Sequence, residues 1–133
     1  MILDTSAVIA ILRGEAEAQR FSAIVERSNA PKMSVASYVE AGAVVDAAKN
    51  PVVSRTLDEF LRVAGVALQP VTVEQGQLAR EAYRDFGRGS GHPAQLNFGD
   101  CFAYALAKAL GEPLLFKGDD FSRTDVERAG DSS

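Results

Sequence analysis

Four short segments rich in apolar residues alternate with longer amphipathic stretches along this chain of 133 residues. These segments cover residues 2–3, 31–35, 66–71 and 113–117. Short apolar runs of this kind, set between polar or turn-forming residues, are typical of strands that are buried on both faces of a sheet. We therefore predict four short strands at these positions.

The stretches between the strands carry apolar residues at helical spacing. Over residues 15–28, for example, Phe21, Ile24 and Val25 fall on one helical face, and the charged residues face away. Asp4 is followed by Thr and Ser, which together offer a good cap for a first helix. The predicted helices cover about residues 5–13, 15–28, 36–49, 57–65, 78–86 and 98–110.

This alternation of strands and helices predicts an α/β fold. Parallel strands need crossover connections, and the connections here are helical, so we expect a three-layer α/β/α sandwich with a central parallel sheet of four or five strands. The length suits a single domain over residues 1–133. Glycine and polar residues predict an exposed loop over 87–97, and the polar end predicts a frayed tail over about 128–133.

Composition and charge narrow the class of protein. Hydrophobic residues make up 47% of the chain and charged residues 24%, as in soluble globular proteins. The net charge of -4 argues against attachment to nucleic acid by overall charge, although local basic groups remain. Arg88 and His92 lie in the predicted loop, and we take them as candidates for a local contact to nucleic-acid phosphate.

The sequence also supports expectations about location. No apolar run is long enough to cross a bilayer, and the N-terminus lacks the basic start of a secretory signal. The single cysteine, Cys101, can form no internal disulfide and offers no cysteine cluster for a metal. We therefore expect a cytoplasmic protein that does not associate with a membrane.

Several acidic residues stand where a globular chain seldom needs them. Asp4 directly follows the first strand, and Asp119 and Asp120 directly follow the last one. Glu40 lies on an apolar helical stripe, and Asp100 opens a helix that is apolar nearly all round. A helix cap, a polar turn or exposure to solvent can explain each of them alone, but not their occurrence together.

The fold is expected to bring these acids to one place. Parallel strands point their carboxyl ends at one edge of the sheet, where ligands bind in this class of fold. Neighbouring carboxylates repel one another, and burial would neutralise some of them unless a cation is present. Oxygen ligands without histidine or cysteine favour Mg²⁺ or Mn²⁺. Because such a metal activates water and neutralises phosphodiester charge, we predict hydrolysis of a nucleic-acid backbone.

Two other chemistries have weaker support. His92 is the only histidine, so RNA cleavage by a pair of histidines acting as acid and base is not indicated. Cys101 adjoins Asp100 and therefore points elsewhere on the helix, where no partner base is visible. We interpret this cysteine as a packed core residue.

Three motifs carry a resemblance to a known family. They are ILDTSAVIAIL, SVASYVEAGAVV and NFGDCFAYALAKALGEPLLFKGDDF, with the acids in the order Asp, Glu, Asp, Asp. In these motifs, and over nearly its whole length, the chain closely resembles PIN-domain toxins of the VapC type, and in particular a mycobacterial subgroup.

The resemblance implies a PIN-like nuclease domain that acts as a Mg²⁺- or Mn²⁺-dependent endoribonuclease. Such a toxin cleaves RNA, is usually dimeric and is held inactive by a VapB-type antitoxin. Asp4, Glu40 and Asp100 match the first three acids of the family, which are catalytic and bind the metal. Thr5 and Ser6 match hydroxyl residues that orient the first acid or a metal-bound water. Asn97 is expected to cap the helix that carries the third acid.

The fourth acid is where the chain departs from the family. Many relatives carry aspartate at the position of Gly118, so Asp119 or Asp120 substitutes for it or the site has three carboxylates. We expect Phe121 to turn into the core, and neighbouring side chains in extended structure point in opposite directions. On this argument Asp119 belongs to the catalytic metal site, and Asp120 faces away from the core in a supporting role.

Two alternatives stay open on the sequence alone. A catalytically silent PIN-fold module would keep the fold only to bind a partner. A phosphatase-type hydrolase using Asp4 would need a second aspartate two residues later, where the chain has Ser6.

We also expect a homodimer, because the apolar residues of the early helices exceed what one small sandwich buries. The residues behind this expectation are Val8, Ile9, Leu12 and Phe21.

Overall fold

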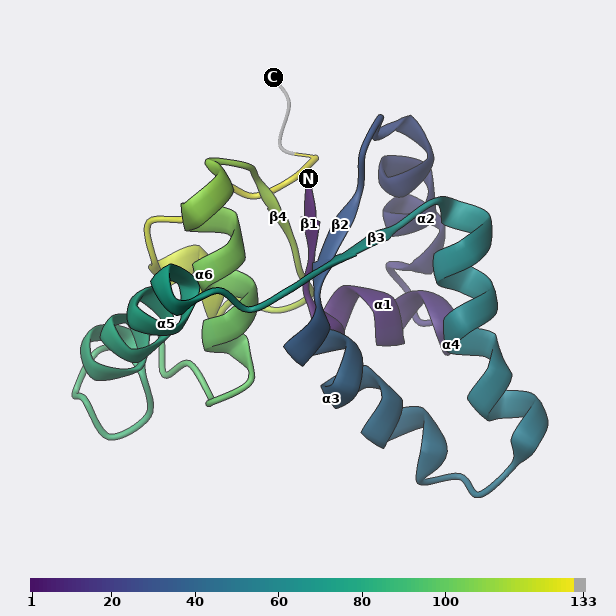
Figure 1. Ribbon diagram of the computed structural model, residues 1–133, viewed down its shortest axis with the longest axis horizontal. Coiled ribbons are helices and arrows are strands. Elements are labelled where there is room, and N and C mark those ends of the chain that lie inside the picture. Colours follow the sequence, from purple (N-terminus) through teal and green to yellow (C-terminus); the bar gives the residue numbers. More distant parts are fainter. Residues whose placement is uncertain (131–133) are drawn as a thin grey trace.

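A four-stranded parallel sheet forms the centre of the structure, a computed structural model that describes residues 1–130. The strand order is β3-β2-β1-β4, and every neighbouring pair is parallel (Figure 1). Ile2 of the central strand pairs with Lys32 on one side and Leu114 on the other. The strands are β1 (Ile2–Leu3), β2 (Lys32–Ser34), β3 (Ala67–Gln69) and β4 (Leu114–Leu115).

Helices cover both faces of this sheet, which confirms the predicted three-layer α/β/α fold (Figure 1). Four of them pack on one face, and α5 and α6 pack together on the other. Their bounds are α1 (Thr5–Leu12), α2 (Ala18–Arg27), α3 (Val35–Asp46), α4 (Pro51–Ala64), α5 (Val73–Phe86) and α6 (Asp100–Leu110), and a short 3-10 turn covers Phe121–Arg123.

Two apolar cores lie on the two faces of the sheet. Leu3 and Leu115 point into the core beneath the first four helices, whereas Ile2 and Leu114 point into the core beneath α5 and α6. This alternation follows from the two-residue period of a strand, and it explains why these strands are apolar throughout.

Two helices begin earlier than predicted. The helix α4 begins at Pro51 and not at residue 57, because the Asn50 side chain caps it by accepting a hydrogen bond from the backbone N–H of Val52. The helix α5 also begins early. The apolar spacing indicates a helix from residue 78, but the helix begins at Val73. Thr72 is the reason, because its hydroxyl accepts a hydrogen bond from the backbone N–H of Gln75 at 3.1 Å and so caps the helix. The cap extends the helix through a stretch without an apolar stripe.

The predicted frayed tail is wrong for residues 128–130. Ala129 is only 4% exposed, and its backbone N–H donates to the carbonyl of Leu114 at 2.8 Å. This pairing alongside β4 holds the chain in place, because a buried strand edge needs a partner for its backbone groups. The rest of the predicted tail, residues 131–133, lies outside the described part of the chain.

The prediction that the early helices expose an apolar surface for a dimer is also wrong. Val8, Ile9 and Phe21 are buried within one copy of the chain, and Leu12 is half-buried. Packing of α1 on α2, together with α4, covers the apolar residues that periodicity alone left without a partner. None of the helices within residues 1–130 is both long and apolar enough to cross a membrane.

Candidate active site

The carboxyl edge of the sheet holds a pocket of about 320 Å³ whose lining includes Asp4, Glu40 and Asp100. Asp4 follows β1, and Glu40 lies on the helix that follows β2. The helix α6 runs back to the start of β4, so its first residue, Asp100, lies at the same edge. The topology therefore brings together three acids that lie far apart in sequence, as predicted.

Asp4 is buried, and its two carboxylate oxygens have different surroundings. Oδ2 accepts hydrogen bonds from the backbone N–H of Ser6 at 2.9 Å and from the Ser6 hydroxyl at 2.6 Å. Oδ1 is buried without a hydrogen-bond partner. Burial, with repulsion from Asp100 and Glu40, raises the pKa of Asp4 to about 7 despite the Ser6 hydrogen bonds. The aspartate caps α1 and also leaves one oxygen unsatisfied.

Ser6 fixes the orientation of Asp4 from two sides. Its hydroxyl donates to Asp4 and accepts a hydrogen bond from the backbone N–H of Lys117 at 3.0 Å. The hydroxyl thus connects the start of α1 with the segment that follows β4. These contacts place Ser6 where it can orient the first acid, and its role in the chemistry stays a prediction.

Asn97 and Asp100 hold each other by reciprocal hydrogen bonds. The backbone N–H of Asn97 donates to Asp100 Oδ2 at 2.9 Å, and the backbone N–H of Asp100 donates to Asn97 Oδ1 at 2.8 Å. Burial raises the pKa of Asp100 to about 6, and repulsion from Glu40 and Asp120 adds to this effect. The predicted supporting role of Asn97 agrees with this pairing.

Glu40 reaches the same place from α3. Its side chain is half-buried, and its negative charge raises the pKa of both Asp4 and Asp100. Its carboxylate packs against Gly99, the residue immediately before Asp100. The face of α3 that carries Glu40 therefore points into the pocket and not to solvent.

Thr5 has a different role from the one predicted. Its hydroxyl donates to the backbone carbonyl of Ser37 at 3.1 Å, so it holds α1 against α3 and is not directed at Asp4. Because Ser37 lies one turn before Glu40, this contact positions the helix that carries the second acid. Thr5 supports the site through the backbone of α3.

The two aspartates after β4 differ in their effect on the third acid. Both are exposed, but it is Asp120 whose charge acts on Asp100 and raises its pKa. The 3-10 turn that begins at Phe121 replaces the extended chain assumed in the prediction, so the alternation of side chains does not apply there. The backbone carbonyl of Asp119 accepts from the N–H and hydroxyl of Ser122. The structure thus favours Asp120 as the fourth acid.

Arg88 and His92, the two residues predicted to contact RNA, have different surroundings. Arg88 is exposed, and its positive charge lowers the pKa of Asp100, which places the guanidinium near the acids. The ring of His92 packs edge-on against Phe86, and its Nδ1 accepts from the backbone N–H of Ala94 at 3.0 Å. Those contacts give His92 a structural role in the loop.

Two basic residues that the sequence analysis did not single out line the acidic pocket. They are Arg13, at the end of α1, and Lys117, after β4. Lys117 Nζ forms an ion pair with Glu15 at 2.7 Å, which raises the pKa of the lysine. Arg13 lies outside the quoted motifs, and Lys117 lies within one without being one of its acids, so the tertiary arrangement is what places both on the pocket.

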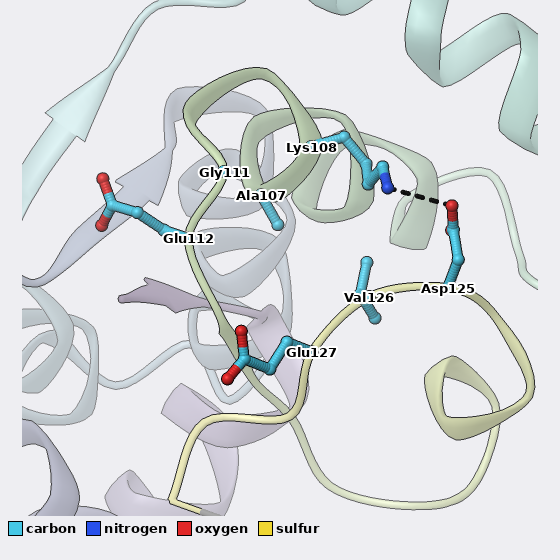
Figure 2. Close-up of a pocket in the computed structure, with 7 residues that line it drawn as sticks. All are labelled: Ala107, Lys108, Gly111, Glu112, Asp125, Val126 and Glu127. Atoms are coloured by element: carbon cyan, nitrogen blue, oxygen red, sulfur yellow. Dashed lines mark hydrogen bonds and ion pairs between the residues drawn. The ribbon is translucent and has the colours of Figure 1, made fainter.

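A second acidic pocket, of about 190 Å³, lies near the opposite end of α6 (Figure 2). Lys108 forms an ion pair with Asp125 at 2.9 Å, and Glu112 binds both the N-terminal ammonium and Lys32. Because these acids already have basic partners, they stabilise the fold and leave the edge near Asp4 as the candidate active site.

The donors at this edge suit a hard divalent cation. They are carboxylate oxygens, and Asp4 Oδ1 is buried without any hydrogen-bond partner. Within residues 1–130, no three acidic, histidine or cysteine side chains are placed so that they could hold a metal ion together. Mg²⁺, however, keeps several waters and takes only one or two carboxylates. An open site built around Asp4 and Asp100 meets that requirement.

The sequence matches one protein family and close relatives that carry ribonuclease names. Residues 1–127 match the PIN domain family. The chain is 54% identical over 131 residues to Ribonuclease VapC28 of Mycobacterium tuberculosis, with 98% of each chain covered. It is 49% identical over 129 residues to Ribonuclease VapC42 of the same species, covering 97% of this chain and 98% of the relative.

Solved structures agree on the fold. The crystal structure of Mycobacterium tuberculosis VapC20, described as a Sarcin-Ricin loop cleaving toxin, superposes with a TM-score of 0.74 at 18% sequence identity. It covers 94% of this chain and 95% of that chain. A chain from a toxin-antitoxin complex of Klebsiella pneumoniae gives a TM-score of 0.66 at 14% identity, over 91% and 89% of the two chains.

Proposed function

This chain belongs to the PIN-domain family, and from that premise we propose that it is an endoribonuclease of the VapC type. It hydrolyses RNA phosphodiester bonds in the cytoplasm as the toxin of a toxin–antitoxin pair. The observation that carries the proposal is the buried, unpartnered Oδ1 of Asp4 in a pocket shared with Glu40 and Asp100. The ribonuclease names of its relatives at 49–54% identity support the same activity.

The proposed cofactor is Mg²⁺ or Mn²⁺, held by Asp4 and Asp100 with Glu40 close by. When bound, such a cation neutralises phosphodiester charge and lowers the pKa of a water. The pKa values of Asp4 and Asp100 are raised. A cation close by would lower both pKa values, because it stabilises the charged carboxylates. The charge of Asp120 acts on Asp100, which supports Asp120 as the fourth acid of the site.

Neighbouring residues orient the acids and bind the substrate. Ser6 and Asn97 hold the first and third acids by the hydrogen bonds described above. Arg88 contacts an RNA phosphate, because it is exposed and its charge reaches Asp100. Arg13, on the lining of the pocket, offers a second phosphate contact. These contacts bring the scissile phosphate to the acids in spite of the negative net charge.

The proposed antitoxin binds an apolar groove of about 470 Å³ on α1, α2 and α4. Ile11, Phe60 and Val63 line this groove, and Val63 is 72% exposed. A structural neighbour comes from a toxin-antitoxin complex, which supports a protein partner of this kind. The antitoxin also directs an arginine or lysine at the acidic edge, where a cation can replace the metal electrostatically. A complex in which that edge stays open and metal-loaded would contradict this mode of inhibition.

The proposed homodimer uses the surface of α5 and α6 instead of the early helices. Phe98 is 71% exposed, its ring packs edge-on against Phe102, and Tyr83 lies on the same pocket. An exposed aromatic cluster of this kind favours a protein interface. The cluster adjoins Asp100, so a second copy would lie beside the acidic site.

The test is cleavage of RNA by the purified protein with Mg²⁺ or Mn²⁺, compared with excess chelator and with Asp100→Asn. We expect cleavage only by the wild type with metal present. Undiminished cleavage in chelator would contradict the metal mechanism. A folded wild type that cuts no RNA, alone or freed of antitoxin, would favour a silent PIN-fold module. Release of phosphate from monoesters would favour a phosphatase that uses Asp4, although Ser6 stands where its second aspartate is needed.

A further inference from the structure

The carboxylate of Glu40 lies directly against the backbone of Gly99. A Cβ atom placed on residue 99 would come within 2.6 Å of Glu40 Cδ and 2.8 Å of Oε1, and it would overlap Oε2. Non-bonded atoms in folded proteins do not pack this closely. Position 99 therefore has no room for any side chain while Glu40 keeps its place.

The backbone at Gly99 does not itself require glycine. Its φ and ψ are -64° and -36°, an ordinary right-handed helical conformation that every residue adopts. This differs from Gly111 at the other end of α6, where φ is 64° and glycine is favoured. Alanine adopts these backbone angles without strain, so the N-cap position that Gly99 occupies before α6 does not by itself require glycine. The glycine at position 99 is thus explained by its neighbour and not by its own conformation.

The neighbour is a residue of the acidic site. Glu40 extends from α3 to the start of α6, where Gly99 directly precedes Asp100. The hydrogen bond from Thr5 to Ser37 holds α3, the helix that carries Glu40, against α1. Any side chain on residue 99 would displace the Glu40 carboxylate, at the flexible end of its side chain, from its place next to the residue before Asp100.

We propose that Gly99 is a positioning residue, whose missing side chain forms the slot that holds the Glu40 carboxylate beside Asp100. The inference rests on the proposed function, because the slot affects catalysis only if Glu40 serves the acidic site. It assigns no contact between Gly99 and RNA or metal. Its effect passes entirely through Glu40.

The test uses Gly99→Ala with Gly42→Ala as a matched control. Gly42 is also helical and lies on the same helix as Glu40, but a Cβ there meets nothing closer than 4.0 Å. We expect Gly99→Ala to keep or raise the thermal midpoint, to lower kcat for RNA about 10- to 100-fold, and to weaken Mn²⁺ binding measured without RNA. Gly42→Ala should keep wild-type kcat and wild-type Mn²⁺ affinity.

Two double variants separate a positioning role from a general effect on structure. In a Glu40→Ala background, Gly99→Ala should cause little further loss, because the residue through which it acts is already gone. Combining Gly99→Ala with Glu40→Asp should recover part of kcat, since the shorter side chain leaves room for the added methyl group. Equal losses from Gly99→Ala with and without Glu40 would overturn the proposal.

The failure of this proposal can be told apart from the failure of the proposed function. A wild type that cleaves no RNA would count against the function, and the crystal structure of Gly99→Ala would still decide whether the slot exists. A Glu40 carboxylate displaced from its wild-type position supports the slot. An unmoved carboxylate, or Gly99→Ala that cleaves RNA at the wild-type rate, overturns it.

Discussion

The hydroxyl of Ser6 accepts a hydrogen bond from the backbone N–H of Lys117 at 3.0 Å, although 111 positions separate the two residues. The same hydroxyl donates to Asp4 at 2.6 Å. One oxygen atom therefore connects the buried acid with the segment that carries Asp119 and Asp120. A change at Ser6 should disturb both parts of the site.

We expect Ser6→Ala to lower the rate of RNA cleavage by about 10- to 100-fold, because an outer partner that orients a metal-binding carboxylate is lost. Stability should fall by about 0.5–1.5 kcal/mol, since the Ser6 hydroxyl no longer bonds to Asp4 or to the exposed N–H of Lys117. Steady-state kinetics and urea unfolding measure the two effects. Ser6→Thr keeps the hydroxyl and serves as the control. Unchanged kinetics in Ser6→Ala would show that Asp4 needs no such support.

The buried Asp4 makes stability depend on pH in a defined direction. Its pKa is raised from 3.8 to about 7, so the folded protein binds a proton that the unfolded chain releases. Stability of the metal-free protein should therefore be greatest below about pH 4 as far as this group is concerned, and should fall as pH rises to about 7. The change is up to about 4 kcal/mol.

Asp4→Asn should remove most of this pH dependence and stabilise the metal-free protein at pH 8, while abolishing cleavage. Mn²⁺ should raise the thermal midpoint of the wild type at pH 8 and leave that of Asp4→Asn unchanged. Denaturant unfolding in chelator over pH 4–8 makes the comparison. A wild type whose stability rises steadily over that range would contradict the raised pKa.

The two aspartates after β4 should differ in their effect on catalysis. Because the charge of Asp120 acts on Asp100, we expect Asp120→Asn to lower metal-dependent cleavage several-fold and Asp119→Asn to have little effect. The rates are compared at saturating and at limiting Mn²⁺, with the largest loss at limiting metal. A greater loss for Asp119→Asn would restore the assignment made from the sequence.

Arg88 should contribute to RNA binding more than to the chemical step. Arg88→Ala should raise the Kd for RNA several-fold and reduce the slope of log affinity against log salt by about one. Arg84→Ala is the matched control, since Arg84 is already bonded to Asp85 at 2.9 Å. Equal salt slopes for wild type and Arg88→Ala would exclude a phosphate contact by this residue.

Phe98 should be required for self-association. Phe98→Ser should convert a dimer to a monomer at micromolar concentration, measured by light scattering, with the helix content unchanged. Leu110→Ser, an exposed apolar residue at the other end of α6, should leave the dimer intact. A wild type that is monomeric in this experiment would refute the dimer.

Much of the fold follows from the sequence, because it depends on local pattern. Strand-forming segments and helical stripes predicted every strand and helix of the three-layer sandwich within a few residues, except for the starts of α4 and α5, which side-chain caps place earlier. The acids Asp4, Glu40 and Asp100 could be predicted to meet, since parallel strands direct their carboxyl ends to one edge. The expectation that Ser6 orients Asp4 came from the family resemblance, and the hydrogen bond between the two side chains agrees with it.

Other features were decided only by the tertiary structure. The charge of Asp120 reaches Asp100 because a 3-10 turn follows β4, and Val8 and Phe21 are covered by helices whose packing the sequence pattern does not reveal. The slot at Gly99 exists because Glu40 arrives there from another helix. Spacing along a chain determines which face a residue takes on its own element, whereas its neighbours depend on how separate elements pack.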